Sequence, residues 1–254
     1  ALKWIGANLI VFYPLNQPGM LHPSICKNCG YTTSGNYCEQ CGQRTAIAQI
    51  TLHSIVHEVF HYFTHLDKGF GYTLKKLISE PGTMQRRYIE GERSRHQKPF
   101  SMFFICGTIS GLGYYFINLG IANLYGLQNE IETGFFRHYF VLLQALLLPL
   151  YTFITWLCFK SERYNYAETL IMMLYNTALV YLALVPIVSV RLLFPDYENR
   201  IVELAFLIVY NLATNLHFYT GKRVNIVLKS LVALLLCYSV SQVMSNLAVE
   251  WLSH

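Results

Sequence analysis

Residues 50–81 read ITLHSIVHEVFHYFTHLDKGFGYTLKKLISEP and lie between a cysteine cluster and a long hydrophobic half. Apolar residues recur at helical spacing, at positions 52, 55, 56, 59, 63 and 66, while histidines at positions 53, 57, 61 and 65 fall on the opposite face. This pattern predicts an amphipathic helix. Glycines at positions 69 and 71 end it, and two further helices are predicted over residues 73–79 and 84–89. We therefore expect residues 50–98 to form an interfacial, amphipathic helical collar on a membrane.

The chain beyond this stretch is strongly apolar. The 254 residues are 54% hydrophobic and 13% charged, with a mean hydropathy of +0.33, which exceeds that of an ordinary soluble domain. A helix needs about 20 residues to cross a hydrocarbon core of about 30 Å. Five runs meet that length, at residues 100–125, 135–159, 169–194, 201–219 and 224–247. The sequence thus predicts an all-α polytopic membrane protein with a five-span domain over residues 99–254.

The charges of the loops predict an orientation. The segments before the first, third and fifth runs are basic, whereas the two loops between them are acidic. Because basic loops tend to stay in the cytosol, we expect a cytosolic N-terminus and a C-terminus on the outer side. The net charge of +5 is concentrated just before the first run, where it suits anionic lipid headgroups. A nucleic-acid partner would need a broader basic surface, so none is expected.

Four cysteines precede the helical stretch in two C-x-x-C-G steps, Cys26 with Cys29 and Cys38 with Cys41. Each step can place two thiolates on one metal ion, and the glycine lets the backbone turn so that its amides approach the sulfurs. Four thiolates leave no open position for catalysis, so we expect structural Zn²⁺ in a ribbon over residues 22–45. Two disulfides are the alternative, and they require an oxidising compartment. Residues 1–21 are expected to be an extension of unknown role.

The motif His57-Glu58-x-x-His61 matches the signature of zinc metallopeptidases, in which two histidines hold the metal and the glutamate activates water. Such a site also needs a third ligand and a dry cleft, and no residue downstream completes a known extended signature. Catalysis, a non-catalytic metal or pH-sensing role, and a plain polar helix face are the three interpretations. The histidines lie opposite the apolar stripe, which favours the plain polar face.

The fourth predicted span contains the polar residues Glu203, Asn211 and Asn215. Polar groups within a span hydrogen-bond to neighbouring helices or line a transport path. Glu203 is the one acidic member and lies near the edge of the span, which favours hydrogen bonding between helices. In the first span, Gly107 and Gly111 form a small-x-x-x-small step that allows close contact with another helix, within the bundle or in another subunit.

The cysteine ribbon is followed by HEVFHYFTHLDKGF at residues 57–70, and then by the motifs YTL, EPG, YIEG and KPF, which begin at residues 72, 80, 88 and 98. In this combination the chain resembles an uncharacterised bacterial inner-membrane family. That family is known mainly as a domain of unknown function with an N-terminal zinc ribbon and several hydrophobic spans. The resemblance covers residues 26–100. It implies the architecture and a location in the bacterial inner membrane, and it supplies no activity or catalytic residue.

Taken together, these features favour a protein that is not an enzyme. We expect an integral inner-membrane scaffold or accessory subunit that docks a protein partner, or a larger membrane complex, through the cytosolic ribbon and the collar. The alternative is a transporter of small solutes or lipids that uses the polar fourth span. A second alternative is a membrane metallopeptidase built on His57, Glu58 and His61.

Overall fold

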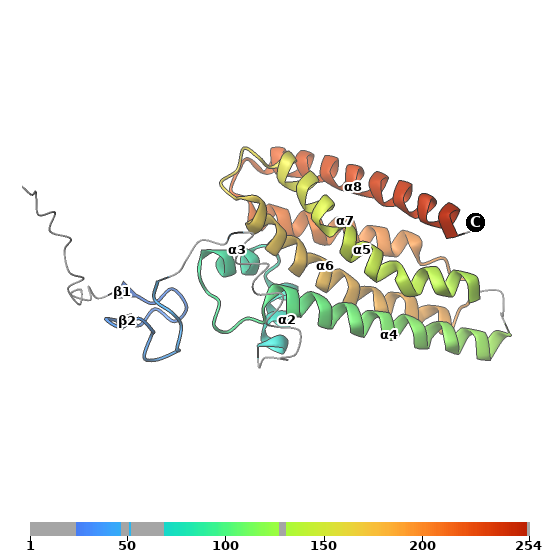
Figure 1. Ribbon diagram of the computed structural model, residues 1–254, viewed down its shortest axis with the longest axis horizontal. Helices are drawn as coiled ribbons and strands as arrows, with labels where there is room; N and C mark the ends of the chain where they lie inside the picture. The colour runs from blue at the N-terminus through green and yellow to red at the C-terminus, as the bar shows by residue number, and fades with distance from the viewer. Residues whose placement is uncertain (1–23, 47–50, 52–68, 127–130, 253–254) are drawn as a thin grey trace, which may run out of the picture. The chain divides into compact units, whose positions relative to one another are not determined.

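The computed structural model describes residues 24–46, 51, 69–126 and 131–252 (Figure 1). The chain divides into two compact units, Ala1–Ala46 and Ile47–His254. The described part of the first unit contains two short strands, and that of the second contains helices. Different sequence signals produce the two units: paired cysteine and glycine turns in the first, and long apolar runs in the second.

The first unit is built from two consecutive hairpins. β1 (Ser24–Ile25) pairs with β2 (Thr32–Thr33), and Tyr37 forms a single antiparallel bridge with Arg44. The antiparallel register of the strands pairs Ser24 with Thr33 and Ile25 with Thr32. One C-x-x-C-G step lies between the partners of each pairing, so each hairpin places two cysteines at its turn.

The second unit consists of helices that follow one another along the chain. In order they are α2 (Phe70–Ser79), α3 (Thr83–Glu90), α4 (Pro99–Tyr125), α5 (Ile131–Cys158), α6 (Tyr166–Ser189), the 3-10 helix η2 (Val190–Leu192), α7 (Arg200–Phe218) and α8 (Arg223–Leu252). The five long helices, α4 to α8, run alongside one another in Figure 1.

Within the described residues, four helical segments are long and apolar enough to cross a membrane. They are Pro99–Tyr125, Tyr166–Leu192, Arg200–Phe218 and Arg223–Met244. Their number and length give the chain the character of a multi-pass membrane protein. In α5, the apolar segment found among the described residues is the shorter Ala145–Cys158, so the fifth predicted span stays a prediction.

α6 is the central helix of the second unit. It packs against α2, α3, α4, α5 and α7, and α8 packs against α5 and α7. Between Ala167 and Tyr181, every residue except Thr177 is buried. The helix begins with a capping box, in which Asn165 Oδ1 accepts from the Glu168 N–H and the Glu168 carboxylate accepts from the Asn165 N–H, both at 2.9 Å. The long helices α5 to α8 form a ring, because α5 packs against α6, α6 against α7, α7 against α8, and α8 against α5.

Small residues allow α4 to approach α6 closely. Ser110 Oγ donates a hydrogen bond to the Tyr181 carbonyl at 3.0 Å, and a Cβ added at Gly113 would lie 2.8 Å from Val185 Cγ1. At Gly111, in contrast, an added Cβ would have nothing within 4 Å. The close contact within the bundle therefore follows the face of Ser110 and Gly113. Each residue turns an α-helix by about 100°, so Gly111 lies on a different side from Ser110 and Gly113. That side is more open.

α2 and α3 form a hairpin that packs against α6 and α7. Leu77 of α2 and Met84 of α3 are both buried. α2 begins at Phe70, three residues before the predicted start, with Gly69 as its N-cap and Gly71 inside the helix. α3 agrees with the prediction to within a residue at each end. The predicted helix over residues 52–66 lies outside the described residues, and the placement of the collar on a membrane surface stays a prediction.

The turn between α2 and α3 lies in close contact with α7. Gly82 has φ of +77°, a conformation that favours glycine. A Cβ added there would collide with the Thr214 carbonyl oxygen and would lie 2.8 Å from the Phe218 nitrogen. Glycine is therefore required both by the backbone conformation and by the approach of a second backbone.

Candidate functional site

The four cysteines are placed by two turns of the same local structure. The N–H of Gly30 donates to the Cys26 carbonyl, and the N–H of Gly42 donates to the Cys38 carbonyl, each at 2.8 Å. Both glycines have positive φ, +76° and +70°. The glycines therefore form the turns that the sequence predicts after each C-x-x-C step.

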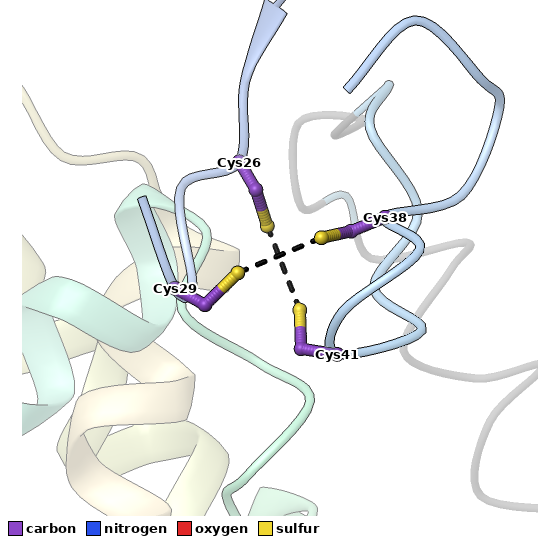
Figure 2. Close-up of side chains that lie close together, drawn as sticks. All are labelled: Cys26, Cys29, Cys38 and Cys41. Carbon is purple, nitrogen blue, oxygen red and sulfur yellow. Dashed lines mark hydrogen bonds between the residues drawn. The ribbon is translucent and has the colours of Figure 1, made fainter. Parts of the chain in front are cut away.

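The four sulfur atoms converge on one point (Figure 2). All lie within 4.8 Å of one another, with 3.6 Å between the sulfurs of Cys26 and Cys41 and 3.5 Å between those of Cys29 and Cys38. A disulfide would need about 2.05 Å, and all four thiols are free. Four sulfurs at about 2.3 Å from one ion in a tetrahedron lie about 3.8 Å apart. The donor set therefore fits one four-coordinate metal ion.

The thiols of this cluster differ in their pKa values. Burial raises the pKa of the Cys41 thiol, but the Gln43 backbone and the Asn28 side chain outweigh it and lower that pKa to about 6. At Cys29 a hydrogen bond with the Tyr31 backbone lowers the pKa of the thiol. Burial and the neighbouring thiols outweigh it and raise that pKa to about 12. A metal ion must displace the protons that remain, so binding is expected to weaken as the pH falls.

The histidine motif is not described by the structure. His57, Glu58 and His61 lie outside the described residues, so neither a peptidase site nor a polar helix face is tested there. Across the part of the chain that is described, the four cysteines are the one group of His, Cys, Asp or Glu side chains close enough to hold a metal ion.

Polar residues of α7 bond to both neighbouring helices. Asn215 Nδ2 donates to Asn211 Oδ1 at 2.9 Å and to Ser230 Oγ of α8 at 3.0 Å. Thr214 Oγ1 donates to Asn176 Oδ1 of α6 at 3.2 Å. The bond to Ser230 agrees with the interpretation of Asn215 as a hydrogen-bonding group between helices, whereas the bond of Asn211 lies within α7. Near the opposite end of the helix, Glu203 accepts from Asn199 Nδ2 at 2.5 Å.

A second polar cluster, around Thr73, joins the hairpin to the segment before α4. Thr73 Oγ1 accepts from the Gln97 N–H at 2.8 Å, and the Tyr175 hydroxyl donates to the Gln97 carbonyl at 2.5 Å. His96 Nδ1 lies 3.4 Å from Thr73 Oγ1 and its ring lies 5.1 Å from that of Tyr72. Sequence reasoning missed this cluster, although the YTL motif that contains Thr73 was a signal.

His96 is a buried histidine in this cluster. Burial is the main cause that lowers its pKa to about 4, and the positive charges of Lys76 and Arg87 act in the same direction. Glu80 opposes them weakly. The imidazole is therefore neutral at physiological pH, and it acts as a packing and hydrogen-bonding group there.

One comparison with known proteins gives a match. Residues 67–111 match the family described as "Protein of unknown function (DUF3667)". No curated protein and no solved structure matches the chain. Together with the cysteine cluster and the apolar helices, this match agrees with the predicted resemblance to an uncharacterised family.

The matched residues extend over α2, α3 and the first part of α4, and they include the YTL, EPG, YIEG and KPF motifs. In the structure these motifs place contacts within the fold. Thr73 accepts from Gln97, Gly82 meets the backbone of α7, and Gly91 ends α3 with φ of +129°. The motifs therefore describe how the hairpin docks on the bundle.

Proposed function

We propose that this protein is an integral membrane scaffold or accessory subunit whose four-cysteine ribbon docks a protein partner. The observation that supports this most is the exposure of large apolar side chains on the ribbon: Ile25, Tyr31 and Tyr37 are 72%, 43% and 62% exposed. A unit of this size needs its apolar groups for a core, and here they lie at the surface. Exposed aromatic and aliphatic groups are typical of protein interfaces.

The metal in this proposal is structural Zn²⁺. Cys26, Cys29, Cys38 and Cys41 would hold it, which fills the tetrahedral shell with protein ligands and leaves no position for a substrate. When bound, zinc supplies folding free energy to a unit that has few apolar groups to bury. The cysteine cluster thus supports a binding module and gives no support to metal catalysis at this site.

The helical unit would hold the ribbon at the cytosolic face of a bacterial inner membrane, with α5 as a fifth span and the C-terminus outside. Basic residues gather at the end of the bundle where α5 meets α6 and α7 meets α8, namely Lys160, Arg163, Lys222 and Arg223. The same end carries α3, because Arg163 forms an ion pair with Glu90. Basic residues at one end support a cytosolic position next to anionic headgroups.

Site-specific photo-crosslinking in living cells tests this function. A photoreactive phenylalanine analogue at position 37 of the full chain should give a discrete protein adduct. The matched control is the same analogue at position 39, where Glu39 is exposed on the same hairpin. Equal yields at the two positions, together with a clean monomer in mild detergent that retains its metal, would contradict the proposal.

A double variant then separates docking from folding. Replacing Ile25 and Tyr37 by serine should abolish the adduct formed from a crosslinker at position 31 while the metal content stays unchanged. An adduct that survives this change would show that the exposed apolar residues are not the docking surface.

A further inference from the structure

An asparagine side chain reaches the cysteine cluster from the first C-x-x-C step. Asn28 lies in the turn between Cys26 and Cys29, where the neighbouring Lys27 is exposed. The side-chain nitrogen of Asn28 is nevertheless buried, and no nitrogen or oxygen atom of the described residues accepts a hydrogen bond from it. Burial of this atom within an exposed turn indicates that the amide is directed inward, toward the sulfur atoms.

The sulfur that the amide meets belongs to the other hairpin. The Asn28 side chain forms a hydrogen bond with Cys41. The geometry of the cluster accounts for this reach, because the sulfurs of Cys26 and Cys41 lie 3.6 Å apart and bring the first turn next to Cys41. An amide N–H donates and a thiolate sulfur accepts, so this bond favours the ionised thiol that a metal ion requires.

The two C-x-x-C-G steps differ at this point. In both steps the second cysteine is hydrogen-bonded by the backbone two residues further along the chain, at Tyr31 or Gln43. Asn28 occupies the third position of the first step, and Gln40 occupies the same position of the second. Gln40 is exposed. Asn28 therefore adds a bond between the hairpins to a pattern that the two steps otherwise share, and Gln40 is its matched control.

A donor at this place matters because of the charge of the centre. Four thiolates carry more negative charge than one Zn²⁺ neutralises, and hydrogen bonds to an ionised acceptor are about twice as strong as those between neutral groups. Groups that hydrogen-bond to metal ligands hold these ligands in position, and their removal typically lowers metal affinity about 10–100-fold. A donor from the first hairpin also fixes a ligand from the second.

We propose that Asn28 is a positioning residue of the metal centre, whose side-chain N–H donates to the Cys41 thiolate and ties the first hairpin to a ligand of the second. The inference rests on the metal binding that is part of the proposed function. It adds to that function a residue outside the four cysteines on which the affinity for the metal depends.

Nuclear magnetic resonance of the full chain in detergent tests this bond directly. The probe is ¹¹³Cd²⁺, a soft ion that thiolates bind, with ¹⁵N-labelled asparagine in the protein. Spin coupling passes along an N–H···S–Cd path, so the side-chain amide protons of Asn28 should couple to ¹¹³Cd. Asn28→Leu identifies the signal by its loss, and exposed Asn36 of the ribbon is the internal reference. An Asn28 amide without this coupling would overturn the proposal.

Competition with a chelator then measures what the bond contributes. Asn28→Leu keeps roughly the shape of the side chain and removes its donor, so the affinity for Zn²⁺ should fall by about 10–100-fold. Gln40→Leu makes the equivalent change at the exposed position and should leave the affinity within about twofold of the wild type. Equal affinities of the two variants would contradict the role of Asn28.

The outcomes also separate this inference from the function on which it rests. A wild-type chain that binds neither Cd²⁺ nor Zn²⁺ at the cysteines would contradict the metal centre itself, and the inference with it. Full affinity in Asn28→Leu would contradict the inference alone, and the metal centre and the docking role of the ribbon would stand.

Discussion

The four-cysteine unit and the helical unit differ in what holds each of them together. Among the described residues of the first, the buried apolar side chains are those of Cys26 and Cys38, and larger groups such as Tyr37 are exposed. In the second, one buried cluster extends from Leu77 in α2 to Ile226 in α8. The first unit therefore depends on ligands that meet at a point, and the second on packing distributed over many side chains. Each should respond to changes that leave the other intact.

The largest effect is expected from breaking the thiolate shell. Replacing Cys26 and Cys29 by serine removes half of the ligands, and with them an apparent zinc-binding free energy of about 10–16 kcal/mol. A unit this small cannot replace that contribution from its own core. Metal content should fall from one ion per chain to none, and the backbone resonances of residues 24–46 should lose their dispersion.

The helical unit is the control for that change. Its thermal unfolding in detergent should move by less than about 0.5 kcal/mol, since the substituted residues belong to a separate compact unit. A metal ion that persists in the double variant would contradict a single site at the cysteines, and it would redirect attention to His57, Glu58 and His61.

The next largest effect should come from the turn of the hairpin. In Gly82→Ala the new methyl group meets the Thr214 carbonyl, and the backbone has to hold positive φ. Overpacking and the conformational cost together should destabilise the helical unit by about 2–5 kcal/mol. Unfolding in detergent measures this change, and the metal content of the ribbon should stay at the wild-type value.

Gly71→Ala is the matched substitution for Gly82→Ala. Gly71 lies inside α2 with open space around it, so alanine should leave stability unchanged or raise it by up to about 1 kcal/mol. Equal losses at the two glycines would show that the hairpin is generally intolerant and that its turn has no special contact.

A smaller effect is expected where α4 meets α6. Gly113→Ala places a methyl group 2.8 Å from a Val185 methyl, and it should cost about 1–3 kcal/mol of unfolding free energy. Gly111→Ala should cost nothing measurable, because its side of the helix is open. The reverse order would mean that the close contact follows the Gly107 and Gly111 step instead.

The smallest effect should be a dependence of stability on pH. The pKa of His96 is lowered from 6.5 to about 4 in the folded protein, so the unfolded chain binds a proton at a higher pH than the folded one does. Stability is therefore fully present above about pH 6.5 and is lost as the pH falls toward 4. After allowance for solvent screening, the loss at pH 5 should be about 1 kcal/mol.

His96→Gln provides the comparison for this pH dependence. Unfolding free energies at pH 7 and pH 5 should differ less in the variant than in the wild type, because the titrating group is gone. An unchanged difference would assign the pH dependence to other groups, such as Glu80, whose pKa is lowered by its hydrogen bond to Lys76.

Local signals in the sequence predicted the cysteine turns and most helix limits well. The glycine after each C-x-x-C step predicted the turns at Gly30 and Gly42, because glycine adopts a positive φ readily whatever its distant neighbours are. The predicted spans over 201–219 and 224–247 begin within one residue of α7 and α8. α5 begins four residues before its predicted start, since polar residues at its beginning hide the helical pattern.

Contacts between distant residues could not be predicted in the same way. Gly82 faces Thr214, and Tyr175 bonds to Gln97, only because α3, α6 and α7 pack together. The EPG and YTL motifs lie at these contacts, but the motifs do not identify the distant residues that they contact. The burial of Gln85 gave no signal in the sequence, because it is decided by elements far along the chain.

The contact of Gly82 with α7 also has a consequence for biosynthesis. Its partner Thr214 is 132 residues further along the chain, and a ribosome adds roughly 5–20 residues per second. The hairpin therefore exists for about 7–26 s before its docking surface has been synthesised. During that interval Leu77 and Met84 have no α7 to cover them. A nascent chain stalled before α7 should expose this hairpin to chaperones or to protease, and one stalled after α7 has been inserted should not.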